Sequence, residues 1–188
     1  MTSSDYLSLP PDLPAPVDDG AAAHLLGATL PSITLAATDG TSVDLSALHG
    51  RTVVYAYPRT GRPGEPLPVA DWDEIPGARG CTPETCGFRD HHAELGAAGA
   101  AVFGLSAQDT PYQQELVSRL SLPFALLSDA VLLLTRALSL PSFEVAGLTL
   151  IKRLTMLVDD GVVSHVWYPV FPPDRHAEEV LDFLRAQA

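Results

Sequence analysis

Both cysteines of the chain lie within one short segment, "PGARGCTPETCGFRD" at residues 76–90. Cys81 and Cys86 have four residues between them, which is not the Cys-x-x-Cys spacing of a dithiol oxidoreductase. In one regular helix their Cα atoms would be about 8.7 Å apart, and about 140° apart around the axis. A disulfide needs Cα atoms within about 7 Å, so this pair closes only if part of the helix unwinds. The spacing therefore suits a cysteine pair that works in two conformations.

Cys81 is placed to react as a thiolate. The residues after it predict a helix start, with Thr82 as N-cap, Pro83 in the first helical position and Glu84 near the positive end of the helix dipole. Free backbone N–H groups at a helix start stabilise a thiolate, and a nearby arginine lowers the thiol pKa further. Five arginines lie within forty residues of sequence: Arg51, Arg59, Arg62, Arg79 and Arg89. The alternative is an inert buried cysteine.

The composition favours one acidic globular domain. The chain has 188 residues, of which 46% are hydrophobic, and a net charge of -12. This charge disfavours binding to nucleic acids and to anionic membranes, whose phosphates repel it. The most apolar stretch, at residues 130–140, is interrupted by Arg136 and is too short to span a bilayer. The N-terminus has no basic start and no continuous apolar run, so we expect a cytoplasmic protein without a signal peptide.

Two structural uses of the cysteines compete with a reactive site. A lasting disulfide is disfavoured in the cytoplasm, and a chain of this size needs no such staple. A zinc site could draw on Cys81, Cys86, His91 and His92. Their spacing does not match the usual short zinc knuckle, and adjacent histidines on a helix diverge by about 100°. We therefore expect no metal.

The sequence around this segment predicts an α/β domain with a central mixed sheet flanked by helices. An N-terminal hairpin is predicted at 30–48, turning at Asp39–Gly40. The other elements are expected in this order: a strand at 51–58, a helix from Thr82, a strand at 100–106, a helix at 110–122 with Thr110 as N-cap, a strand at 124–128, a short helix at 129–140, a hairpin at 153–169 turning at Asp160–Gly161, and a helix at 172–188. Residues 1–24 are expected to form a loosely ordered arm, residues 25–188 a single domain, and residues 59–76 a long inserted loop.

Several segments together resemble one known family. The segment "GCTPETCGFRD" is similar to the active-site segment of peroxiredoxins of the bacterioferritin-comigratory-protein type, also called peroxiredoxin Q, within the AhpC/TSA superfamily. The segments "VVYAYP", "VFGLSAQDTPYQQELVSRLSLPFALLSD" and "KRLTMLVDDGVV" resemble the family's strand before the active site, its central region and its late hairpin. The likeness covers roughly residues 25–186, apart from the loop at 59–76.

The resemblance implies a thioredoxin-like fold and a thiol peroxidase that reduces hydrogen peroxide and organic hydroperoxides. Cys81 matches the peroxidatic cysteine, which forms a sulfenic acid, and Cys86 matches a resolving cysteine on the same helix, which closes an intrachain disulfide. Arg153 matches the arginine beside the peroxidatic sulfur; without the family match it would be an ordinary strand arginine. Substrate contacts are expected from Gly80, Thr82 and Pro58. The implied reductant is thioredoxin or a similar dithiol, no cofactor is needed, and the protein is expected to be a monomer or a weak homodimer.

One position departs from the family pattern. The family has a threonine three residues before the peroxidatic cysteine, and here that residue is Ala78. Thr60 and Thr82 are the candidates to supply a hydroxyl instead. The loop at 59–76, which contains Trp72, is either a lid over Cys81 or a surface insertion with one packed tryptophan.

Two other functions stay open from the sequence. The first is a peroxide-sensing redox switch, in which the disulfide changes partner binding and turnover is incidental. The second is a general thiol–disulfide oxidoreductase, which the spacing of the cysteines disfavours.

Overall fold

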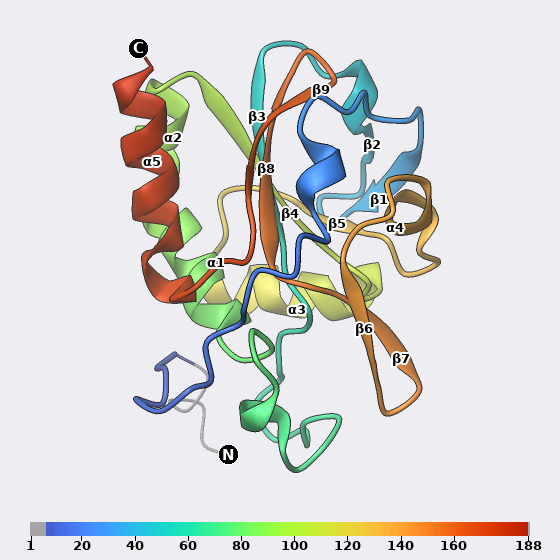
Figure 1. The fold of residues 1–188 in the computed structure, drawn as a ribbon, viewed down its shortest axis with the longest axis vertical. Helices are drawn as coiled ribbons and strands as arrows, with labels where there is room; N and C mark the ends of the chain where they lie inside the picture. Colours follow the sequence, from blue (N-terminus) through green and yellow to red (C-terminus); the bar gives the residue numbers. More distant parts are fainter. Residues whose placement is uncertain (1–6, 188) are drawn as a thin grey trace.

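A seven-stranded mixed sheet forms the centre of the computed structural model, which describes residues 7–187 (Figure 1). The strand order is β2-β1-β5-β4-β3-β8-β9. Neighbours among β3, β4 and β5 run parallel, and the other neighbouring strands run antiparallel. The strands are β1 (Thr34–Ala37), β2 (Ser42–Asp44), β3 (Arg51–Ala56), β4 (Ala100–Ser106), β5 (Leu126–Ser128), β8 (Leu154–Asp159) and β9 (Val162–Trp167). The predicted α/β class with a central mixed sheet is confirmed.

Helices cover both faces of this sheet. One face packs against α1 (Cys81–Asp90), α2 (His92–Ala97), α3 (Thr110–Leu120) and α5 (His176–Ala186). The other face packs against α4 (Leu133–Ala137) and the short 3-10 helix η2 (Ala23–Leu25). Three further 3-10 helices are η3 (Leu45–Ala47), η4 (Trp72–Glu74) and η5 (Pro173–Arg175). Within residues 7–187, no helix is long and apolar enough to cross a bilayer.

Strand β3 is apolar along its length because both of its faces are buried. Val53 and Tyr55 pack with one core, and Val54 and Ala56 pack with the other. Side chains of neighbouring strand residues point to opposite faces, so a strand covered on both sides has no polar positions to alternate with. The predicted buried strand at 51–58 is therefore confirmed.

Both predicted hairpins and the closing helix are also found. β1 and β2 pair antiparallel across Asp39–Gly40, where Gly40 has a φ of +86°. β8 and β9 turn at Asp160–Gly161. The buried side of α5 carries Val180, Leu181 and Leu184.

Both predicted helix starts are displaced from the residues expected. The N-cap of α1 is Gly80, with a φ of +105°, and Thr82 is the second residue of the helix. A side chain at Gly80 would be strained in this conformation, and its Cβ would lie 2.4 Å from Cγ of Pro173. In α3 the N-cap is Asp109, whose carboxylate accepts the Tyr112 backbone N–H at 2.8 Å. The assignments of Thr82 and Thr110 as N-caps are therefore wrong by one or two residues.

A second, two-stranded sheet has no counterpart in the sequence prediction. It is a hairpin of β6 (Ser142–Val145) and β7 (Leu148–Ile151) that extends from the body of the molecule (Figure 1). Its turn contains Ala146 and Gly147, with φ of +49° and +75°. Alanine rarely adopts a positive φ, so this turn lacks the Asn-Gly or Asp-Gly signal by which hairpins are recognised.

The N-terminal arm contacts the body of the protein over its described part. Asp19 accepts hydrogen bonds from Lys152 Nζ at 2.6 Å and from the Tyr168 hydroxyl at 2.7 Å, and Ala22 is buried. These contacts differ from the loosely ordered arm expected over residues 1–24, because partners that are distant in sequence hold Asp19 in place. Residues 1–6 lie outside the described part of the chain.

Candidate active site

Three segments meet at the carboxyl end of β3. Ala56, the last residue of β3, pairs with Leu154 at the start of the antiparallel strand β8. Arg153 precedes Leu154, so this register places it beside the segment that follows β3. The first turn of α1 packs over the same end and brings Cys81 to Arg153, 72 residues away in the sequence.

The sulfur of Cys81 is enclosed, with 2% of the residue exposed. Arg153 Nη2 donates to Sγ at 3.2 Å, and the thiol donates to the carbonyl oxygen of Ala78 at 3.5 Å. Burial raises the pKa of Cys81, the charge of Arg153 opposes this, and the charge of Glu84 adds to it. The pKa therefore lies above its ordinary value. Arg153 and the backbone of Arg59 lower this pKa, as expected of nearby arginines, but in this closed arrangement desolvation of the thiolate outweighs them.

Glu84 is a site residue whose role here the sequence did not predict. Its carboxylate forms an ion pair with Arg153 Nη1, and the side chains are 0% and 2% exposed. Burial raises the pKa of Glu84, and the charge of Arg153 opposes that shift. The only signal available in the sequence was spacing. Residues three apart on a helix lie on the same side, so Glu84 is expected on the side of the helix that carries Cys81. The sequence assigned Glu84 only to the helix dipole.

Arg153 also fixes the turn that precedes Cys81. Its Nη2 lies 3.3 Å from the carbonyl oxygen of Gly77 and 3.0 Å from that of Arg79. One guanidinium therefore contacts the sulfur, the carboxylate of Glu84 and the backbone leading into α1. This planar fork of donors is a property of arginine that lysine does not share.

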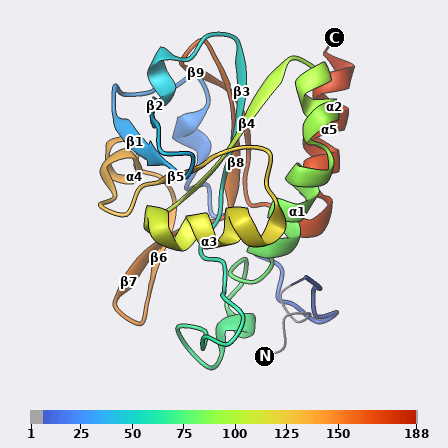
Figure 2. The same ribbon diagram turned by 180° about the vertical axis from the view of Figure 1, so that it is seen from behind.

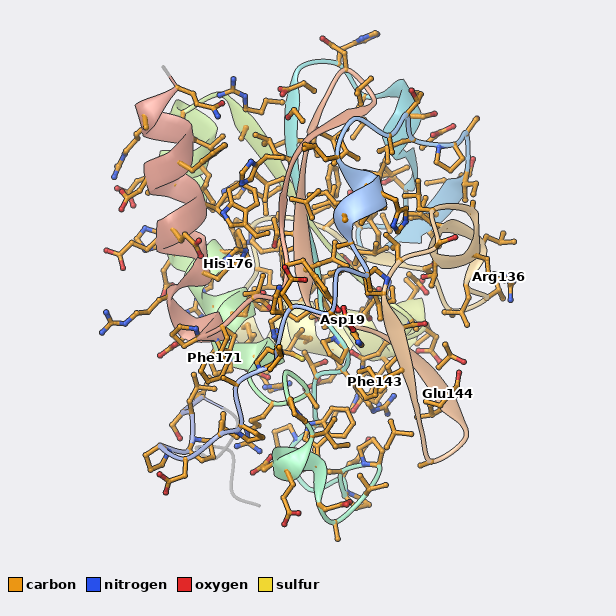
Figure 3. The ribbon with its side chains drawn as sticks, viewed as in Figure 1. Asp19, Arg136, Phe143, Glu144, Phe171 and His176 are labelled. Carbon is orange, nitrogen blue, oxygen red and sulfur yellow. The ribbon has the colours of Figure 1, made fainter. Side chains whose placement is uncertain are left out.

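Behind Glu84 lies a buried histidine from the last helix. His176 is the first residue of α5, and its Nε2 lies 2.8 Å from the hydroxyl of Thr155 (Figure 3). Its Nδ1 lies 3.1 Å from a carboxylate oxygen of Glu179. The electrostatic influence of His176 extends to Glu84, whose pKa it lowers. The C-terminal helix thus packs directly against the site.

Cys86 is half-buried and lies on α1 with Cys81, and both thiols are free. Four residues of regular helix lie between the two, so the disulfide cannot form without unwinding α1. Burial raises the pKa of Cys86, while the charges of Arg89 and Arg119 lower it.

The structure separates the residues expected to contact substrate. Thr82 is buried and lines the same hollow as Cys81, together with Gly80. Thr60 does not line this hollow, and its hydroxyl donates to Gln108 Oε1 at 3.0 Å. Of the two candidate threonines, only Thr82 therefore lines the hollow that reaches Cys81. Pro58 does not line this hollow; it lines a different cavity, which Arg153 also lines.

The two hollows differ greatly in size. The one that reaches Cys81 has a volume of about 20 Å³, and Leu67 and Trp72 of the inserted loop form part of its wall. The other has a volume of about 260 Å³ and a mostly apolar lining that includes Phe143 and Pro58, but Cys81 does not line it.

The side chains considered for zinc point to other partners. His91 lies 2.7 Å from a carboxylate oxygen of Glu94, and the His92 ring packs against Phe124. No cluster of three or more His, Cys, Asp or Glu residues suited to a metal ion occurs within residues 7–187.

Comparison with known proteins places this site in a family. The chain matches the family described as Redoxin over residues 25–181. It is 32% identical over 187 residues to the chloroplastic peroxiredoxin Q of Gentiana triflora, covering 96% of this chain and 78% of that protein. It is 35% identical over 162 residues to the chloroplastic peroxiredoxin Q of Oryza sativa subsp. japonica, covering 85% of this chain and 66% of that protein, just under two thirds of its length.

A solved structure has the same fold. The structure of the peroxidoxin BcpB from Mycobacterium tuberculosis superposes with a TM-score of 0.69 at 28% identity, covering 87% of this chain and 97% of that one. This likeness confirms the predicted thioredoxin-like fold, and the relatives confirm the predicted family. The chain belongs to the redoxin family and, within it, to the peroxiredoxin Q group.

Proposed function

We propose that this protein is a thiol peroxidase in which Cys81 reduces hydroperoxides. The observation that carries the proposal is the guanidinium of Arg153, whose Nη2 lies 3.2 Å from Sγ of a cysteine at the first residue of a helix. A guanidinium and free helix N–H groups at this point stabilise a thiolate and also the charge that develops on a departing oxygen.

The first step is a two-electron oxidation of the sulfur. The Cys81 thiolate attacks one oxygen of the hydroperoxide in line with the O–O bond. An S–O bond forms, the O–O bond breaks, and the departing oxygen takes up a proton to become water or an alcohol. Cys81 is left as a sulfenic acid, the reversible first product of thiol oxidation. We assign the oxyanion contacts to Arg153 and the hydroxyl contact to Thr82, with Gly80 and Pro58 shaping the surroundings.

The second step closes a disulfide. The Cys86 thiol attacks the sulfur of the sulfenic acid, and a water molecule leaves. This step requires the first turn of α1 to unwind, since the helix holds the two residues too far apart. An external dithiol, such as thioredoxin, then reduces the disulfide by thiol–disulfide exchange. A cytoplasmic location and a monomeric or weakly dimeric state stay predictions.

One experiment tests the chemistry. One equivalent of hydrogen peroxide is added to the reduced protein in the presence of dimedone, free thiols are alkylated, and the products are identified by mass spectrometry without reduction. A Cys81–Cys86 disulfide is expected in the unchanged protein, and a dimedone adduct of Cys81 in Cys86→Ser. If Cys81→Ser consumes peroxide at the unchanged rate, the assignment of Cys81 is wrong.

A further experiment separates an enzyme from a sensor. With excess dithiothreitol, a peroxidase turns over many equivalents of peroxide per protein chain. Oxidation that is fast for the first equivalent and then stops, with each of several dithiol donors, would favour the redox switch.

A further inference from the structure

The inserted loop at residues 59–76 covers the sulfur, and this segment is called the cap below. The cap lies at one end of the molecule, beside α1 and α3 (Figure 2). From within it, Leu67 and Trp72 wall the hollow that reaches Cys81. Trp72 is only 2% exposed, so its ring is packed against the protein and not directed to solvent.

The first part of the cap is fixed to α3 and to the loop before it. Arg119 Nη2 donates to the carbonyl oxygen of Gly61 at 3.1 Å, and Arg62 Nη2 donates to that of Pro111 at 3.2 Å. The guanidinium of Arg62 also lies over the ring of Tyr112, 3.9 Å from its centroid. Thr60 adds its backbone N–H and its hydroxyl, which both donate to the side chain of Gln108.

The second part of the cap is fixed to the β6–β7 hairpin. Trp72 and Leu150 are buried in one small apolar cluster, to which Ala78 also belongs. Partly buried side chains complete the cluster from both segments: Leu67, Val69 and Ile75 from the cap, and Phe143 and Val145 from the hairpin. In Figure 3, Phe143 lies on the side of the hairpin that faces the cap, and Glu144 lies on the opposite side. The cap is therefore held at both ends by elements outside it.

The space that the cap leaves beside Cys81 is very small. The hollow has a volume of about 20 Å³, and a single water molecule requires roughly 10–15 Å³. Hydrogen peroxide, with two oxygen atoms, is close to this limit. A tert-butyl or cumyl group does not fit inside the hollow and would have to extend past Leu67 and Trp72 while the peroxide group reaches Sγ.

The larger cavity does not relieve this limit. Arg153 lines it, and Cys81 does not. Arg153 both lines that cavity and contacts the sulfur, and its guanidinium is already engaged by Sγ and by Glu84.

We propose that the cap is a size filter, and that Leu67 and Trp72 are the residues that select hydrogen peroxide over bulky organic hydroperoxides. This inference rests on the proposed peroxidase function. The cap acts by steric exclusion: a small peroxide enters the hollow as it is, whereas a bulky one must first displace the packed side chains of the cap.

The test compares two substrates in the same protein. Second-order rate constants for the oxidation of Cys81 are measured by stopped flow with hydrogen peroxide and with cumene hydroperoxide. The readout is the ratio of the cumene constant to the hydrogen peroxide constant, which is independent of the fraction of active protein. Leu67→Ala and Trp72→Ala are each expected to raise this ratio about tenfold, the scale at which apolar pockets discriminate small differences in size.

Two variants serve as controls. Leu148→Ala is the matched control for Leu67→Ala. Leu148 is exposed on the hairpin and lies outside the apolar cluster, so its replacement should leave the ratio unchanged. Trp72→Phe keeps an aromatic ring in the cap and should change the ratio less than Trp72→Ala.

The outcomes separate the two proposals. If neither peroxide oxidises Cys81 in the unchanged protein, the proposed peroxidase function fails. If it reacts with both peroxides at similar rates, or if both alanine variants leave the ratio unchanged, the size filter is overturned while the peroxidase stands.

Discussion

At the scale of the residue, one buried guanidinium contacts both a thiol and a carboxylate. Arg153 and Glu84 balance each other's charge, so the site is neutral while Cys81 is a thiol and carries one negative charge when Cys81 ionises. Burial therefore opposes formation of the nucleophile, and Arg153 is the group that offsets part of this cost. Arg153 has two roles in this arrangement: it stabilises the thiolate and it holds the turn before Cys81 in place.

We expect Arg153→Met to slow the reaction of Cys81 with hydrogen peroxide about 100-fold or more, the usual loss when one donor to a developing oxyanion is removed. The pKa of Cys81 should also rise, since the opposing positive charge is gone. Stopped-flow oxidation measures the rate. Arg136→Met is the matched control, because Arg136 is exposed on α4 (Figure 3) and should leave the rate unchanged. A loss smaller than about threefold in Arg153→Met would contradict the role given to this residue.

Glu84→Gln should have the opposite effect on the thiol. The carboxylate raises the pKa of Cys81, so its removal should move the pH profile of Cys81 alkylation by iodoacetamide to lower pH. The unfolding free energy should fall by about 3–5 kcal/mol, because Arg153 loses the partner of a buried ion pair. The profile is measured in a Cys86→Ser background, so that only one thiol reacts.

The control for this change is Glu144→Gln, at an exposed residue on the hairpin (Figure 3). It should leave both the alkylation profile and the unfolding free energy unchanged. An alkylation midpoint in Glu84→Gln that stays in place, or moves to higher pH, would show that Glu84 does not act on the thiol through its charge.

At the scale of the element, the start of α1 decides where the sulfur lies. Gly80 has a positive φ and packs against Pro173 of η5, so the backbone turns sharply and Cys81 becomes the first helical residue. The same turn places Gly80, Cys81 and Thr82 in the wall of the hollow under the cap. The cap and the β6–β7 hairpin then enclose the sulfur from outside, as two elements that depend on each other for their packing.

Gly80→Ala should destabilise the protein by about 2 kcal/mol or more, because alanine at a positive φ costs about 1–2 kcal/mol and its Cβ would also meet Pro173. The oxidation of Cys81 should slow with it. Gly96→Ala is the matched control: Gly96 lies in α2, where an added Cβ would have open space around it, so this change should be neutral or slightly stabilising. Urea denaturation measures the unfolding free energy of both variants. Equal stability of the two variants would contradict the strain assigned to Gly80.

At the scale of the whole molecule, segments from both halves of the chain converge on α1. The cap and the hairpin enclose its first residue, η5 packs against Gly80, and α5 packs along the helix, with Ala177 next to Gly87. A change in α1 is therefore transmitted to the C-terminal part of the protein. Closing the disulfide must disturb these contacts, since it unwinds the first turn of the helix.

Oxidation to the disulfide should accordingly increase hydrogen exchange in more than one segment. We expect faster exchange of the amides at 84–86, which lose the first helical hydrogen bonds of α1, and smaller increases in the cap and in η5. The amides of α4, which packs on the opposite face of the sheet, serve as an internal reference. Hydrogen–deuterium exchange with mass spectrometry compares the reduced and oxidised states. Unchanged exchange at 84–86 after complete disulfide formation would contradict local unwinding of α1.

The sequence predicted those parts of the structure that depend on local signals. The apolar run of β3, the Asp-Gly turns of the two sheet hairpins and the amphipathic pattern of α5 each specify an element from neighbouring residues alone. The two helix starts were displaced for different reasons. At α3, Asp109 and Thr110 both suit an N-cap and are adjacent in the sequence, and Asp109 takes the position. At α1, Gly80 is the N-cap without any side-chain hydrogen bond, so no side chain marks the position. The β6–β7 hairpin was missed because Ala146–Gly147 is an unusual turn.

By itself, the sequence determined the fold class, the family and the segment that carries both cysteines, because these follow from local patterns and from motifs. Only the tertiary structure decided that Glu84 pairs with Arg153, that Thr82 and not Thr60 lines the hollow at Cys81, and that Leu67 and Trp72 form part of its wall. Each of these depends on contacts between residues that are far apart in the chain. Such contacts are set by strand register and by packing, and they leave no local pattern in the sequence from which they could be predicted.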